Sequence, residues 1–138
     1  IARAATKRIM SVGLSVGTRL PATATAMGRV LLAGLDQDEA RRRIIASDRK
    51  KLTPRTVTGV RELQDIVALA KERGYSIVDQ ELEVGLTSIA VPVISAAGTV
   101  VASINISVQS QRVSIAEMEK SFLPRLIDTQ RQMRPLIK

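Results

Sequence analysis

The sequence has no cysteine, no histidine and no tryptophan, and Tyr75 and Phe122 are its only aromatic residues. Without cysteine there are no disulfides and no thiolate chemistry, and without histidine the commonest metal ligand and the usual near-neutral acid or base are missing. No pairing of nucleophile and base is evident either, so we expect neither an enzyme, nor a metal site, nor a cofactor.

Long apolar runs are also missing. None of them reaches the roughly 18 residues that a membrane span needs, and the first residues lack the pattern of a signal peptide. We expect a cytoplasmic protein without membrane association. Because the chain does not begin with methionine, we also expect it to be one part of a longer protein.

Positive charge is abundant, with a net charge of +8 and basic clusters at Arg41–Arg43 and Arg49–Lys51. Such a charge favours nucleic acid or an acidic partner, because bound phosphates release counterions. Yet the chain has no aromatic platform on which bases could stack and no recognition helix. An ordinary solvated surface is therefore the favoured interpretation, and direct DNA binding by this chain remains the alternative.

Hydrophobic periodicity predicts a single α+β domain over residues 1–138. Two short strands are expected within Arg8–Leu20, with Ile9, Val12, Leu14, Val16 and Leu20 buried. Helices are expected from a Thr23 cap to Ala33, from an Asp36 cap to Ala46, from about Leu63 to Arg73, and after a capping box formed by Ser114 and Glu117. Strands are expected at Tyr75–Val78, Leu86–Ile94 and Val100–Val108, with Gly34 and Gly74 as left-handed helix ends, Pro92 at an edge or bulge, and Pro124 kinking or splitting the last helix.

The last two strands form a predicted hairpin. A four-residue loop, Ser95 to Gly98, would place Ile94 opposite Thr99. One face of this hairpin is then almost continuously apolar, whereas the other gathers short uncharged hydrogen-bonding side chains, namely Ser88, Ser103, Asn105 and Ser107. This polar face suits a small-molecule site, but a solvated or helix-covered face remains an alternative.

Three stretches, "VGTRLPATATAMGRVLLAGL", "GYSIVDQELEVGLTSIAVPV" and "GTVVASINISV", resemble the C-terminal effector-binding domain of the IclR family of bacterial transcriptional regulators. Together they span nearly the whole chain. The segments "KLTPRTVT" and "DQELEVGLTSIAVPV" are similar to the branch that controls the β-ketoadipate pathway, which breaks down protocatechuate, 4-hydroxybenzoate and catechol. The resemblance implies a GAF-like antiparallel sheet flanked by helices, a ligand pocket on one sheet face and a separate N-terminal winged helix-turn-helix.

By position, the resemblance assigns ligand contacts to Ala26, Met27, Asp79, Ser88, Asn105 and Ser107. Ser88 stands where the family often has cysteine. The first-turn N–H groups at Ala26 and Met27 would suit a carboxylate; core packing is the alternative for Met27. Asp79 would repel an anion unless it accepted a hydroxyl hydrogen bond, so a bond to a backbone amide or an arginine is its alternative. Arg19 is a candidate counter-charge, with an exposed surface role as its alternative.

These observations predict a domain that senses an aromatic-acid catabolite or keto acid and controls an attached DNA-binding domain, within a homodimer or homotetramer. The competing prediction is an oligomerisation module without a ligand of its own. The effector, the direction of regulation, the target promoters and the number of subunits do not follow from the sequence.

Overall fold

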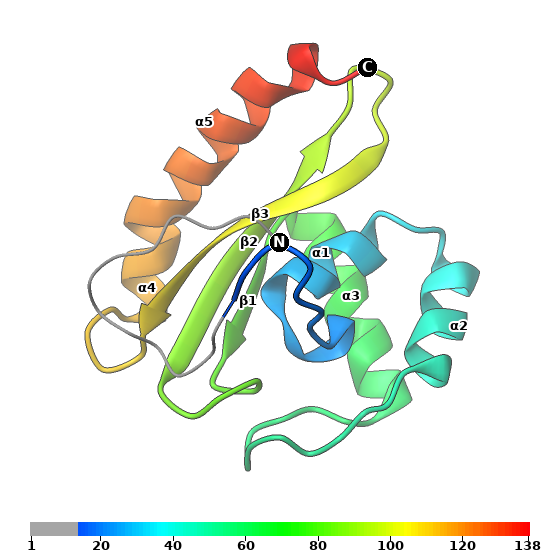
Figure 1. Cartoon of the computed structure of the whole chain (residues 1–138), viewed down its shortest axis with the longest axis vertical. Coiled ribbons are helices and arrows are strands. Elements are labelled where there is room, and N and C mark those ends of the chain that lie inside the picture. The colour runs from blue at the N-terminus through cyan, green and yellow to red at the C-terminus, as the bar shows by residue number, and fades with distance from the viewer. Residues whose placement is uncertain (1–13) are drawn as a thin grey trace.

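The computed structural model describes residues 14–138 and has an α+β fold (Figure 1). The elements run in the order 3-10 turn Ala22–Ala24, α1 Ala26–Ala33, α2 Gln37–Ala46, α3 Val60–Arg73, β1 Ser76–Asp79, β2 Leu86–Ile94, β3 Val100–Gln109, α4 Ile115–Glu117, a π-helical segment Met118–Phe122, α5 Leu123–Met133 and 3-10 turn Arg134–Leu136. Of the expected N-terminal strands, Ile9 and Val12 lie outside the described residues. The described part, from Leu14 to Leu20, forms a turn rather than a strand, and Val16 is 82% exposed instead of buried.

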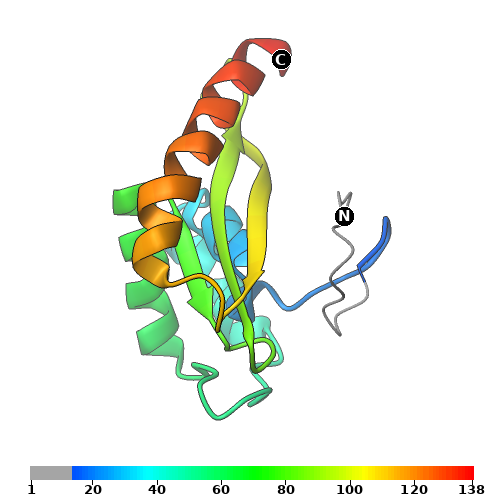
Figure 2. The ribbon, with the colours of Figure 1, turned by 90° about the vertical axis from the view of Figure 1, so that its left-hand side faces the viewer.

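Helices cover both faces of a three-stranded antiparallel sheet with the order β1-β2-β3 (Figures 1 and 2). On one face, Ile89 and Val91 pack with Met118 and Leu126 from the C-terminal helical segment. On the other face lies α1, and α2 and α3 pack against α1 through a second apolar cluster that includes Leu63. The sheet therefore has helices on both of its faces, which confirms the expected α+β fold with an antiparallel sheet flanked by helices, although helices on both faces are more than a two-layer arrangement contains.

The β2–β3 register differs from the prediction by two residues. Ile94 lies opposite Val100 rather than Thr99, because the loop spans five residues and is closed by the Ser95 N–H donating to the Thr99 carbonyl at 2.9 Å. A bulge then follows, since Val93 faces Ala102 and leaves Val101 as an extra residue. Two one-residue displacements preserve the parity, so most side chains stay on the predicted faces although their partners change.

Helix ends follow the expected chemistry in part. The Asp36 carboxylate accepts from the Glu39 N–H, and Gly74 closes α3 in the left-handed region at φ 82°. The cap of α1 is Thr25 and not Thr23, because Thr23 is buried within the preceding 3-10 turn. Gly34 ends α1 in a right-handed conformation rather than a left-handed one.

Gly34 is needed for close approach. A Cβ atom built at Gly34 would lie 2.6 Å from the Val100 Cβ, a separation that real side chains do not adopt. Val100 therefore faces α1, whereas the sequence pattern placed it with Ile104 and Ile106 on the opposite side. The bulge beside Val101 explains this change of side.

The two prolines that interrupt regular elements are both accommodated. Pro92 lies in the central strand, but it is beyond the last β1 pair, Ser76 with Ala90, and only the Val93 pair separates it from the bulge. Pro124 is in the first turn of α5, where its missing N–H is tolerated, and a π-helical segment separates this helix from α4. Across residues 14–138 no helix has the length and apolarity required to cross a membrane.

Candidate functional site

The polar sheet face carries a hydrogen-bonded cluster formed by Ser88, Asn105 and Ser107. The Ser88 and Ser107 hydroxyls are 2.7 Å apart, as expected for residues directly opposite each other, and the Asn105 amide donates to the Ser107 hydroxyl at 3.1 Å. Ser107 is exposed and the other two are partly exposed. These side chains bond one another rather than backbone, which leaves further donor and acceptor capacity free for a ligand.

The first turn of α1 lies against the same sheet face. Ala26, with Met27 beside it, packs on Val78 and Ala90, and Ala90 lies directly opposite Asn105. Thr25 caps the helix by accepting from the Gly28 N–H at 3.1 Å. The N–H groups of Ala26 and Met27 precede the first helical hydrogen bond, so they can bind an anion next to the polar cluster.

The other two predicted site residues in the sheet, Ser103 and Asp79, lie on opposite faces of it. Ser103 is on the polar face, opposite Pro92 and two residues from Asn105, and is partly exposed. Asp79 pairs with Thr87, and two residues along the same strands Ile77 pairs with Ile89. Ile77 and Ile89 pack against the C-terminal helical segment, so by alternation the Asp79 side chain is also on that face, opposite the polar cluster.

Asp79 and Arg19 have surroundings that match the alternatives given for them. The Asp79 carboxylate accepts from the Thr87 hydroxyl at 2.8 Å and forms a 3.0 Å ion pair with Arg55. Arg19 is exposed in the segment before α1, and residues 14–138 give it no ion-pair partner. A role for either residue toward a ligand stays a prediction.

A buried ion pair next to the site was not predicted. The Arg29 guanidinium, 2% exposed, forms a two-point contact with the Glu81 carboxylate at 2.7 and 2.9 Å, and its Nε–H donates to the Thr23 carbonyl at 2.9 Å. All of these contacts are charge-assisted and strong. The signal in the sequence was an arginine inside the apolar stretch "AMGRVLLA", whereas the segment that contains Glu81 had no assigned structure.

The loop before α3 is tied to the same glutamate. The Glu81 carboxylate also accepts from the Val57 N–H at 3.0 Å, and the Thr56 hydroxyl donates to the Glu81 carbonyl at 2.6 Å. The Thr53 hydroxyl donates at 2.6 Å to the carbonyl of Gln80, which itself has a left-handed backbone conformation with φ 59°. Together with the Arg29 contacts, these bonds hold three segments to one another: the 3-10 turn before α1, the loop before α3 and the segment between β1 and β2.

The electrostatics of the polar cluster are simple because it contains no titratable side chain. Its capacity lies in neutral hydrogen bonds and in the partial positive charge at the start of α1. Nor do residues 14–138 contain a group of three Asp, Glu, His or Cys side chains that could hold a metal ion. The arrangement is chemically suited to binding a small organic acid that also bears a hydroxyl or keto oxygen.

Comparison with known proteins follows the same direction. The family model described as "Bacterial transcriptional regulator IclR C-terminal" matches residues 1–134. The chain is 45% identical over 134 residues to the Pca regulon regulatory protein of Pseudomonas putida, covering 96% of this chain and 46% of that protein. It is 35% identical over 130 residues to the p-hydroxybenzoate hydroxylase transcriptional activator of Acinetobacter baylyi, covering 94% of this chain and 48% of that protein.

Among solved structures, a double mutant of the PobR inducer-binding domain from Acinetobacter, in complex with 3-hydroxybenzoic acid, superimposes with a TM-score of 0.89. It is 33% identical, and the match covers 96% of this chain and 75% of that one. The chain spans about half the length of the curated relatives described above.

Proposed function

The chain belongs to the bacterial transcriptional regulator IclR C-terminal family, and from that premise we propose that its ligand is a small hydroxylated aromatic acid or a keto-acid product of one. It is a ligand-sensing regulatory domain. A bare oligomerisation module is not favoured, since a relative's inducer-binding domain is described in complex with a hydroxybenzoate. We assign the chain no enzymatic role, because its relatives are transcriptional regulators.

One observation carries the proposal: the start of α1 and the polar cluster of Ser88, Asn105 and Ser107 lie on the same sheet face. The ligand carboxylate would bind the N–H groups of Ala26 and Met27, where the helix dipole favours negative charge. Its hydroxyl or keto oxygen would bond to the serine hydroxyls and the Asn105 amide.

The regulatory step follows from binding at a helix end. A ligand that contacts both α1 and the sheet favours one placement of α1, and this changes how subunits are arranged in a homodimer or homotetramer. We propose that an attached N-terminal winged helix-turn-helix then changes its affinity for DNA in the bacterial cytoplasm. This requires the ligand to bind one subunit arrangement more tightly than the other, and a tenfold difference in that affinity corresponds to about 1.4 kcal/mol.

A thermal-shift screen of this chain tests the proposal. The panel contains protocatechuate, 4-hydroxybenzoate, 3-hydroxybenzoate, β-ketoadipate and cis,cis-muconate. We expect one compound to raise the melting temperature in a concentration-dependent manner, because a ligand that binds only the folded state stabilises it by about 2.7 kcal/mol at 100 times its Kd. The double variant Ser88→Leu with Asn105→Leu should remove the shift.

A matched control replaces two polar residues away from this face, Gln111→Leu with Gln132→Leu. Both positions are exposed, and this variant should keep the parental response. If the Ser88 and Asn105 variant still responds to a hydroxybenzoate as the parent does, the ligand site is elsewhere and the assignment is wrong. If no compound in the panel changes the melting temperature of the parent, the proposed ligand class is wrong.

A further inference from the structure

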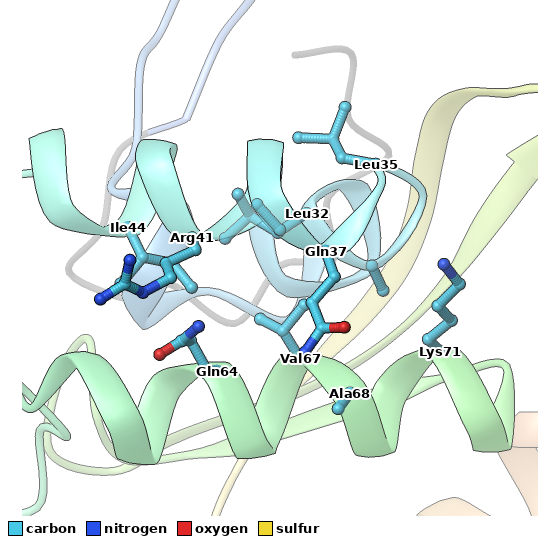
Figure 3. Close-up of a pocket in the computed structure, with 11 residues that line it drawn as sticks. Leu32, Leu35, Gln37, Arg41, Ile44, Gln64, Val67, Ala68 and Lys71 are labelled. Atoms are coloured by element: carbon cyan, nitrogen blue, oxygen red, sulfur yellow. The ribbon is translucent and has the colours of Figure 1, made fainter.

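A groove of about 200 Å3 opens between α1, α2 and α3, on the far side of α1 from the sheet (Figure 3). Its floor is aliphatic, because Leu32, Ile44 and Val67 reach it from the three helices. None of the residues in the polar sheet cluster lines it. The groove is therefore a separate cavity, and the proposed effector site does not use it.

The rim of the groove carries two cations and no carboxylate. Arg41 comes from α2 and Lys71 from α3, and residues 14–138 offer neither of them an acidic partner within 4.0 Å. The contrast with the two following arginines on α2 is clear, since Arg42 and Arg43 both bond to Glu39, at 2.6 and 2.9 Å. The arginine that lines the groove is thus the one without a carboxylate.

The two cations lie at opposite ends. Figure 3 shows Arg41 beside Gln64 at one end of the groove and Lys71 at the other, with Gln37 between them. Gln64 and Lys71 are seven residues apart on α3, which corresponds to about 10 Å along a helix. An occupant that satisfies this rim needs a negative charge at each end and an apolar middle over the aliphatic floor.

We propose that this groove is a second ligand site, for a small aliphatic dicarboxylate. A six-carbon dicarboxylate spans about 6 Å between its carboxyl carbons, and the flexible Arg41 and Lys71 side chains cover the remaining distance. The guanidinium can bind one carboxylate by two parallel hydrogen bonds, and the ammonium binds the other as a point charge. Gln37 and Gln64 add neutral donors at the rim.

Calorimetric titration of the 138-residue chain with adipate, and separately with hexanoate, tests the site. Hexanoate has the same length and one charge fewer, so we expect it to bind about tenfold or more weakly. Arg41→Gln and Lys71→Gln should each weaken adipate binding by about tenfold. Arg42→Gln is the matched control, because it removes the same charge from the same helix at a position that does not line the groove, and it should leave adipate affinity unchanged.

Each of the following results would overturn the proposal: no adipate binding at millimolar concentration, equal affinity for hexanoate, or the same loss in Arg42→Gln as in Arg41→Gln. The Ser88→Leu with Asn105→Leu variant separates this site from the sheet face. It should bind adipate as the parent does, and loss of adipate binding in it would assign the ligand to the polar cluster instead. Because all of these substitutions are at exposed or partly exposed positions, melting curves without ligand should stay close to that of the parent.

Discussion

Arg29 carries a fully buried positive charge within a helix that otherwise packs on apolar neighbours. Its guanidinium contacts the Glu81 carboxylate and the Thr23 carbonyl, so each of its three nitrogens donates to an acceptor. Buried ion pairs of this kind add little net stability compared with apolar replacements, but they are costly to break from one side. At the scale of single residues, this makes Glu81 more critical than any surface carboxylate.

Glu81→Leu should lower the free energy of unfolding by about 3 to 5 kcal/mol, because it leaves the Arg29 charge buried without a partner. Urea unfolding followed by circular dichroism measures the change. Arg29→Met in the same background should recover part of the loss, since no buried charge then remains. A Glu81→Leu protein as stable as the parent would contradict this role. Glu39→Leu, which breaks the surface ion pairs with Arg42 and Arg43, serves as the comparison with a small expected effect.

Tyr75 gives a second prediction, in this case for alkaline pH. Its hydroxyl donates to the Glu119 carboxylate at 2.5 Å, and this bond, together with partial burial, raises the pKa of Tyr75 above its ordinary value of 10.0, although the nearby Arg73 opposes the shift. Since the folded pKa is raised, the stabilising contribution is complete below the unfolded pKa and is lost as the pH rises through the folded value.

The measurement is direct because Tyr75 is the only tyrosine in the chain, so the near-ultraviolet absorbance of tyrosinate reports it alone. We expect a titration midpoint above that of free tyrosine, and a lower midpoint in Glu119→Gln. In Tyr75→Phe, the fall in the free energy of unfolding at alkaline pH that comes from breaking this bond should be absent. An unshifted midpoint in the parent would show that the Glu119 contact is not maintained in solution.

At the scale of elements, the β2–β3 hairpin shows which features a sequence pattern can fix. Alternation predicted that Ser88, Asn105 and Ser107 share one face, and they do, because alternation depends only on parity. The partner of each residue was wrong, since loop closure at Ser95 and the bulge at Val101 depend on backbone geometry that composition does not reveal.

Contacts between residues far apart in the sequence could not be predicted either. The capping box at Ser114 is a local motif, and the bond from the Glu117 N–H to the Ser114 hydroxyl was correctly predicted. By contrast, Arg29 and Glu81 are 52 residues apart, and nothing local pairs them. The polar face of the candidate site was therefore predictable, whereas the ion pair that holds the adjacent helix start was not.

The contact between α1 and β3 yields a prediction at this scale. Gly34→Ala places a methyl group against Val100 and should lower the free energy of unfolding by about 1 to 3 kcal/mol, because the packed backbones must move apart. Denaturant unfolding measures the loss. Val100→Ala in the Gly34→Ala background makes room for the methyl group and should restore much of the stability; if it restores none, the close approach is not the cause.

At the scale of the whole molecule, α1 is the central element. It lies between the sheet and the pair formed by α2 and α3, as Figure 1 shows, and it contributes residues to two of the apolar clusters. The sheet and α5 form the other half of the molecule around a third cluster. Any displacement of α1 therefore has to disturb packing on both of its sides.

The position of α1 has a thermodynamic consequence. Its first turn borders the polar cluster and its last turn, at Leu32 and Ala33, borders the groove, and a helix of eight residues is only about 12 Å long. If occupants bind at both ends, they act on one rigid body, and reciprocity requires that each changes the other's affinity by the same factor. The domain would then integrate two chemical signals. The affinity for one ligand, measured with and without the other, would give the coupling free energy between the two sites.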